Sequence, residues 1–255
     1  MKKLIAFDLD GTLAPSKSHF DNRMVSLFNR LLNIFDVCVI SGAKYELFQT
    51  QFLTQITSDP ALLGRLHLLP TTGTRYYRFI DGSWQQQYAE DFTPKDKAKI
   101  IKALEDGWAE AGEPIRKTYG PTIEDRESQI TLSPLGQEVV AMLGDEGVRV
   151  KESWDPDMQK RMKVRDVVAQ RLPDFSVNVA GLTSIDVTIP GVDKAYGISK
   201  LMEQTGFAKE DILFMGDKIM SGGNDYPVQQ MGIDCIAVER WEDTAYAIEG
   251  IVSAL

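Results

Sequence analysis

Cysteine and histidine are scarce in this 255-residue chain, which has two of each. Cys38 and Cys235 both lie inside apolar segments with strand character, where a buried free thiol is expected rather than a disulfide or a metal ligand. His19 and His67 have no partner pattern, and we expect both to be structural. The sequence therefore gives no sign of a Cys/His metal site, or of a Ser-His-Asp or Cys-His catalytic group.

Basic residues and long apolar runs are also few. Lys and Arg number 28 against 37 Asp and Glu, a net charge of −9, which argues against a nucleic-acid partner because a polyanion needs a basic face. No apolar segment approaches the ~20 residues of a membrane span. The first predicted strand begins within a few residues of Met1, where no signal peptide fits, so we expect a cytoplasmic protein with no membrane partner.

Four short apolar runs are present, and each leads into polar residues. Unbroken apolar runs are typical of buried parallel strands, and open α/β sheets bind ligands at the carboxyl ends of their strands. We therefore expect two carboxylates, a hydroxyl and a distant third carboxylate to meet at one sheet edge. The runs are Leu4–Phe7 before Asp8-Leu9-Asp10, Val37–Ile40 before Ser41-Gly42, Ile212–Met215 before Gly216-Asp217, and Cys235–Val238 before Glu239.

The surrounding pattern predicts an α/β fold, in which a Rossmann-like parallel-sheet core is interrupted by an inserted α+β domain. Helical spacing, an Asp21 cap and an Asp81-Gly82 turn signal support the core elements. We place the core at residues 1–85 and 188–255 and the insert at 86–187. Expected core helices span 21–35, 45–53, 196–205 and 244–254, and a hairpin spans 75–84.

The insert shows the alternation of an antiparallel sheet with one wet face. Its expected helices span 94–111 and 155–172, and its expected strands span 116–119, 122–126, 129–133, 176–179 and 183–189. A basic run on the second helix is expected to be a solvated face rather than a binding patch. The run comprises Lys160, Arg161, Lys163, Arg165 and Arg171.

The segment Asp8-Leu9-Asp10-Gly11-Thr12 is the most specific sign of chemistry. Asp8 can act as a nucleophile, because aspartate forms acyl-phosphates in phosphoryl transfer. Asp10 would then be the general acid that protonates the leaving oxygen, and later the base that activates the acceptor. A calcium-loop fragment or a polar turn is the alternative, but no further Asp follows at loop spacing.

A second acidic group follows the third run. Asp217 would be a metal ligand, with Asn224 and Asp225 binding the metal directly or supporting a ligand, and a set of oxygen ligands favours Mg²⁺ over zinc. Ser41-Gly42 would donate hydroxyl and backbone N–H bonds to a phosphate, and Lys194 would neutralise it. Ordinary turns and a solvated lysine are the alternatives.

The chain resembles the haloacid dehalogenase (HAD) superfamily, whose four motifs match, in order, Asp8-x-Asp10-Gly11-Thr12, Ser41, Lys194, and Gly216-Asp217 with Asn224-Asp225. Over nearly its whole length it is most similar to the eukaryotic-type phosphomannomutase branch, which has a large α/β cap (subfamily IIB). The likeness is clearest at residues 216–225 and, in the cap, at 122–126 and 132–136. It implies a HAD core, a substrate-specificity cap, and a possible homodimer through the cap.

The resemblance also implies substrate contacts. Arg126 falls on a family arginine that grips the far phosphate of a sugar, and Ser184 and Asp186 fall on residues that contact the substrate. Lys17 falls where the family has an arginine after the first motif, and we expect it to bind substrate.

Some positions depart from the family pattern. Gln137 and Tyr119 stand where the family has arginines, the next basic position falls near Gly144, and Ser41-Gly42 replaces paired glycines. A mutase must hold a bisphosphorylated sugar, which requires a second cationic phosphate clamp, and Arg suits this role through its bidentate fork. That clamp is depleted in this sequence.

The first hypothesis is therefore a Mg²⁺-dependent phosphatase or phosphotransferase that acts on small phosphorylated sugars through phospho-Asp8. By resemblance, Mg²⁺ would be held by Asp8, the Asp10 backbone carbonyl and Asp217. The alternative is a phosphomannomutase that interconverts mannose 1-phosphate and mannose 6-phosphate. A non-catalytic phosphosugar-binding protein is a remote third, disfavoured because Asp8 and Asp10 are both present.

Overall fold

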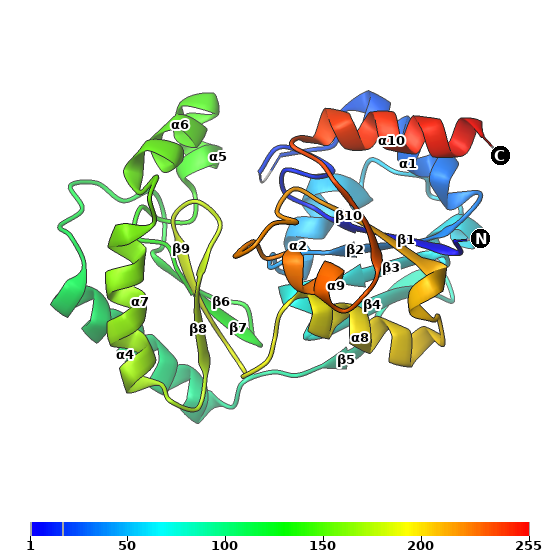
Figure 1. Cartoon of the computed structure of the whole chain (residues 1–255). Helices are drawn as coiled ribbons and strands as arrows, with labels where there is room; N and C mark the ends of the chain where they lie inside the picture. Colours follow the sequence, from blue (N-terminus) through cyan, green and yellow to red (C-terminus); the bar gives the residue numbers. More distant parts are fainter. Residues whose placement is uncertain (1, 17, 255) are drawn as a thin grey trace. The chain divides into compact units, whose positions relative to one another are not determined.

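The structure, a computed structural model, describes residues 2–16 and 18–254 (Figure 1). The chain divides into two compact units, one formed by Met1–Ala89 with Val192–Leu255 and the other by Glu90–Gly191. The sequence places these divisions a few residues earlier, before residues 86 and 188. That the second unit acts as a substrate cap stays a prediction. Among the described residues, no helix is long and apolar enough to cross a membrane.

The first unit contains a seven-stranded sheet in the order β11-β10-β1-β2-β3-β4-β5. The first five strands of this order are parallel, and β4 and β5 form an antiparallel hairpin at one end. The predicted α/β class with a mainly parallel sheet is confirmed. The strands are β1 (Leu4–Asp8), β2 (Asp36–Ile40), β3 (Leu66–Leu69), β4 (Arg75–Ile80), β5 (Ser83–Ala89), β10 (Ile212–Gly216) and β11 (Asp234–Ala237).

Helices cover both faces of this sheet (Figure 1). Ile5 and Phe7 of β1 pack in one apolar cluster with α1 and α10, whereas Leu4 and Ala6 pack in another with α8. Burial on both faces explains why the parallel strands read as unbroken apolar runs. The helices are α1 (Asn22–Leu32), α2 (Tyr45–Phe48), α3 (Pro60–Leu63), α8 (Lys194–Thr205), α9 (Tyr226–Gln230) and α10 (Trp241–Ser253), with short turns η1 (Gln49–Leu53), η2 (Thr71–Gly73) and η3 (Lys209–Asp211).

Two local signals in the core, the Asp21 cap and the Asp81-Gly82 turn, are confirmed. The Asp21 side chain caps α1 by accepting from the Arg23 N–H at 2.8 Å. Asp81 and Gly82 have φ of 51° and 79°, as a tight hairpin turn requires, and Gly206 ends α8 with φ of 76°. The segment predicted as one helix over 45–53 is instead α2 followed by the π-helical turn η1. The sequence pattern missed α3 and α9, because helices of four or five residues are too short to show a period, and it missed β3, whose apolar run is interrupted by His67.

The second unit is an antiparallel sheet in the order β6-β7-β9-β8, with helices packed on its apolar face. Ile130 and Leu132 of β7 lie in one cluster with Leu104 of α4 and Val168 of α7. The strands are β6 (Ile123–Asp125), β7 (Gln129–Leu132), β8 (Ser176–Ala180) and β9 (Ser184–Thr188); the helices are α4 (Pro94–Ala111), α5 (Val139–Leu143), α6 (Asp145–Trp154) and α7 (Gln159–Arg171). The strand predicted over 116–119 is not formed, and α5 and α6 were not predicted.

The prediction that the basic run is a solvated face is wrong for Arg161, which is buried. Its side chain is 3 % exposed and donates through Nε to Asp155 Oδ2 at 2.7 Å. Further guanidinium bonds reach the carbonyl oxygens of Ala180 and Gly181, at 3.1 and 2.8 Å. Asp155 also accepts from backbone N–H groups at the start of α7, so it precedes this helix rather than opening it as predicted. The buried pair ties α7 to the β8–β9 turn.

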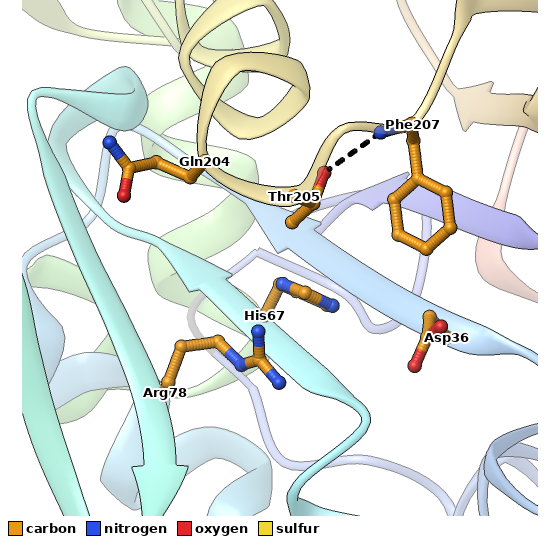
Figure 2. A pocket seen from close by; sticks show the side chains of 6 residues that line it. All are labelled: Asp36, His67, Arg78, Gln204, Thr205 and Phe207. Atoms are coloured by element: carbon orange, nitrogen blue, oxygen red, sulfur yellow. Dashed lines mark hydrogen bonds between the residues drawn. The ribbon is translucent and has the colours of Figure 1, made fainter.

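A hollow of about 250 Å³ lies at the amino-terminal edge of the seven-stranded sheet (Figure 2). It is lined by Asp36, His67, Arg78, Gln204, Thr205 and Phe207. His67 Nδ1 is 2.7 Å from Tyr76 Oη, and the predicted structural role of His67 agrees with this buried contact. Burial, assisted by the Arg78 charge, lowers the pKa of His67 to about 3. The histidine therefore stays neutral at physiological pH.

Candidate active site

The opposite, carboxyl-terminal edge of the sheet brings the predicted residues together. β1 and β10 are adjacent and parallel, so Asp8 at the end of β1 lies beside Asp217, which follows β10. Ser41 follows the neighbouring strand β2. Gly11 has φ of 88°, and a methyl group at this position would lie 2.8 Å from Asp217 Oδ2. Only glycine fits both the backbone conformation and this close approach.

Lys194 is the buried cation of the site. It is the first residue of α8, whose start is fixed by Asp193, which accepts from the Tyr196 N–H at 2.8 Å. Lys194 Nζ is 2.5 Å from Asp8 Oδ1 and also donates to Asp225. The lysine is 2 % exposed, which overturns the alternative of a solvated side chain.

Burial raises the pKa of Asp8 to about 8; Lys194 opposes the shift, and the charges of Asp225 and Asp217 add to it. Burial alone would lower the pKa of Lys194, but the Asp8 and Asp225 carboxylates outweigh it and raise this pKa. The exposed Lys218 Nζ is 2.6 Å from Asp217 Oδ2. With all three carboxylates ionised, they would outnumber the two ammonium groups, and the raised pKa of Asp8 reflects this excess of negative charge.

The donor set fits a hard divalent cation. One carboxylate oxygen each from Asp8, Asp217 and Asp225 lies within 4.8 Å of the others. Oxygen ligands at such spacing suit a cation of the Mg²⁺ type, and the excess charge would be offset by it. Asn224, a further predicted ligand in addition to the Asp10 carbonyl, is exposed next to Asp225.

The remaining predicted core residues surround this cluster. Asp10 is half-buried, and its Oδ1 accepts from the Gln51 amide at 3.3 Å. Ser41 is buried, and its Oγ accepts from the Ala43 N–H at 3.1 Å across Gly42, in a local turn. The predicted substrate residue Lys17 lies outside the described residues.

The predicted substrate residues of the second unit lie on the polar side of its sheet. Glu124, Thr131, Asp186 and Asn178 face one another in register across β6, β7, β9 and β8. Thr131 Oγ1 donates to Asp186 Oδ1 at 2.7 Å. Arg126 directs Nε toward Glu124 Oε2 at 2.9 Å, so this arginine is paired within its own unit.

A second polar chain on this sheet includes Ser184. Its Oγ is 2.7 Å from Ser133 Oγ, and the Gln137 amide donates to the same Ser133 oxygen at 3.0 Å. Gln137, which stands where the resemblance predicts an arginine, therefore contributes a neutral hydrogen bond to the side-chain network around Ser184.

Comparison with known proteins identifies the family. The family model described as eukaryotic phosphomannomutase matches residues 24–254. The chain belongs to the eukaryotic phosphomannomutase family. It is 25 % identical to a phosphomannomutase of Schizosaccharomyces pombe over 229 residues, 89 % of this chain and 85 % of that protein. Over 252 residues, 95 % of this chain and 91 % of the relative, it is 25 % identical to a phosphomannomutase of Encephalitozoon cuniculi.

The fold of this phosphomannomutase-family chain is also similar to that of solved structures with other names. The IMP-nucleotidase of Plasmodium falciparum, with IMP bound, matches with a TM-score of 0.66 at 15 % identity, over 100 % of this chain and 68 % of that one. A trehalose-6-phosphate phosphatase related protein matches with a TM-score of 0.57 at 15 % identity, over 99 % and 98 %. At these identities the likeness concerns the fold, and the HAD-type fold implied by the sequence motifs is confirmed.

Sequence reasoning did not single out Gln51, although it contacts Asp10. If this segment were a regular helix with Phe52 in the core, Gln51 would be expected on the polar face. The π-helical turn that buries both side chains leaves no period in the sequence. Only the closeness of η1 to the first motif in the fold reveals this residue.

Proposed function

We propose that the protein is a phosphomannomutase, which transfers a phosphoryl group between the 1 and 6 positions of mannose through phospho-Asp8. The observation that carries the proposal is the buried Asp8–Lys194–Asp225 cluster beside Asp217 and Asp10, in a chain of the phosphomannomutase family. Relatives named phosphomannomutase favour this reaction over the phosphatase that the sequence pattern placed first.

The proposed transfer has two balanced halves. An Asp8 carboxylate oxygen attacks phosphorus, the bond between phosphorus and the sugar oxygen breaks, and Asp10 gives its proton to that oxygen. In the return step, the oxygen of the accepting hydroxyl bonds to phosphorus and its proton passes to Asp10, while the P–O bond to Asp8 breaks. Lys194 keeps Asp8 oriented and offsets charge, so that catalysis consists of positioning and charge neutralisation.

Mg²⁺ is the proposed metal, and Asp8, Asp217 and Asp225 would hold it, with the Asp10 carbonyl and Asn224 as further predicted ligands. When bound, the ion would supply positive charge for the transferring phosphoryl group. We propose that Arg126, Ser184 and Asp186 bind the sugar phosphate, and that Ser41 and Gly42 donate to the transferring phosphate.

A phosphatase is the second candidate, and Gln137 favours it. The Gln137 amide is uncharged and is bound to Ser133 at 3.0 Å, whereas a mutase must clamp a second phosphate. Water would then replace the sugar hydroxyl as the acceptor from phospho-Asp8.

The deciding experiment follows mannose 1-phosphate with Mg²⁺, with and without a hexose bisphosphate, and measures mannose 6-phosphate and free phosphate together. Mannose 6-phosphate that depends on the bisphosphate, with little free phosphate, is the expected result. Free phosphate without the isomer would replace the mutase with a phosphatase. If neither product forms, mannose phosphate is not the substrate.

A further inference from the structure

Gln51, to which no motif assigns a role, contacts the proposed general acid. Its Nε2 donates to Asp10 Oδ1 at 3.3 Å and to the Ser18 carbonyl oxygen at 3.2 Å. The residue is 2 % exposed and belongs to the π-helical turn η1. Both partners are acceptors, so the amide must present its NH₂ end to them, which fixes its orientation.

Packing alone would favour an apolar side chain at this position. Gln51 Oε1 is buried with no hydrogen-bond partner among the described residues, a state that costs about 1–3 kcal/mol. The neighbouring Phe52 is fully buried and stacks on Phe20 with ring centres 4.9 Å apart. π-helical turns frequently occur at functional sites. A glutamine kept here at this cost indicates that its NH₂ end has a function.

We propose that Gln51 is a positioning residue for phosphoryl transfer. By holding Oδ1, it fixes the plane of the Asp10 carboxyl group and so the direction of Oδ2 toward the leaving and accepting oxygens. The inference rests on the proposed acid–base role of Asp10. Proton transfer requires heavy atoms about 2.6–3.2 Å apart, and a misplacement of about 1 Å can cost about 10²-fold in rate.

The test compares Gln51→Leu with Gln55→Leu. Gln55 lies just after η1, and its amide binds the same loop, accepting from the Phe20 N–H at 3.1 Å and donating to the Phe20 carbonyl at 3.4 Å, without contacting Asp10. For Gln51→Leu we expect kcat on a hexose phosphate to fall about 10- to 10²-fold with little change in KM. The loss on p-nitrophenyl phosphate should be much smaller, because nitrophenolate leaves without a proton. Gln55→Leu should stay near wild type on both.

A double mutant separates positioning from general damage. Gln51→Leu added to Asp10→Asn should cause no further loss, because the residue acts through Asp10. Equal losses on the two substrates, or a full additional loss in the Asp10→Asn background, would overturn the proposal.

The role of Gln51 can also be tested if the proposed substrate is wrong. An enzyme that turns over glycerol phosphate but no hexose phosphate contradicts the proposed function, while the comparison of variants proceeds on glycerol phosphate. If no ester is turned over, crystal structures of wild type and Gln51→Leu decide. A changed Asp10 side-chain torsion supports positioning, and an unchanged one overturns it.

Discussion

The two edges of the core sheet differ in how their ionisable side chains are partnered. At the carboxyl-terminal edge, one buried ammonium group, that of Lys194, is shared between Asp8 and Asp225. Asp217 adds a third carboxylate within reach of the same point. Charge at this edge is concentrated and only partly neutralised.

At the amino-terminal edge, the charged side chains each have a nearby partner, although Arg78 Nε is buried without a hydrogen-bond partner among the described residues. Asp36 lies 3.5 Å from Arg65 Nε, and Arg78 Nη2 donates to the Gly64 carbonyl oxygen at 2.6 Å. His67, with its pKa lowered to about 3, stays neutral. The hollow of about 250 Å³ lies at this edge (Figure 2).

Crowded carboxylates, rather than an open cavity, therefore mark the candidate active site of this molecule. Grouping three carboxylates around one buried lysine disfavours the ionisation of all three until a cation offsets the negative charge. Perturbed ionisable groups of this kind are typical of functional sites. Five predictions test this difference and the site that it marks.

The largest effect is expected from exchanging a carboxylate at each edge. Asp8→Asn should abolish turnover, because an amide cannot form the phospho-enzyme, whereas Asp36→Asn should leave turnover near wild type. Steady-state rates of the two purified variants, with thermal melts to verify folding, provide the measurement. Retained turnover in Asp8→Asn would remove Asp8 as the nucleophile.

Asp10→Asn should lower kcat by about 10²–10⁴, the usual contribution of a general acid or base. The loss should be smaller for an aryl phosphate, whose leaving group needs no proton. Rates on a hexose phosphate and an aryl phosphate measure this, and a loss of the same size on both would argue against proton transfer by Asp10.

Arg126→Ala should raise KM for a phosphosugar with little effect on a small aryl phosphate. Arg171→Ala is the matched control in the same unit, since Arg171 forms an exposed ion pair with Glu110 at 2.5 Å. An exposed pair contributes about 0–1 kcal/mol, so this control should change neither KM nor stability much. Equal effects of Arg126→Ala on both substrates would exclude it from sugar binding.

The smallest effect concerns stability and pH. The unfolded chain protonates histidine near 6.5, whereas folded His67 does so near 3. The free energy of unfolding should therefore fall as pH drops from about 6.5 to 3, by at most about 1.4 kcal/mol per pH unit from this residue. In urea titrations at a series of pH values, the free energy of unfolding of His67→Gln should fall less steeply with decreasing pH than that of wild type.

Asp8 should act in the opposite direction in metal-free protein. Its pKa is raised from 3.8 to about 8, so the folded state binds the proton first, and stability should rise as pH falls from about 8 toward 4. Asp8→Asn should remove this rise. If His67→Gln and Asp8→Asn both keep the wild-type dependence of stability on pH, the two pKa shifts are contradicted.

The carboxyl-terminal edge could be predicted from the sequence because it follows from strand pattern alone. Apolar runs locate the parallel strands, and the edge rule then brings Asp8, Asp217 and Ser41 together. Lys194 and Asp225 could be predicted from the motifs that the chain shares with the HAD superfamily.

Other features depend on contacts that no local pattern records. Arg161 is buried because the distant carbonyls of Ala180 and Gly181 accept from it. The segment at 116–119 forms no strand, and Tyr119 instead bonds the turn near Leu135, with its N–H 2.8 Å from that carbonyl oxygen. Gln51 contacts Asp10 from a π-helical turn, which changes the direction of its side chain relative to a regular helix.

Direct detection of the phospho-enzyme tests the central claim, that Asp8 carries the phosphoryl group. The protein is quenched in acid during turnover of a hexose phosphate with Mg²⁺, and its peptides are analysed by mass spectrometry. We expect one phosphoryl group on Asp8 in wild type and none in Asp8→Asn. Turnover with phosphate on another residue, or with no phospho-enzyme at all, would contradict it.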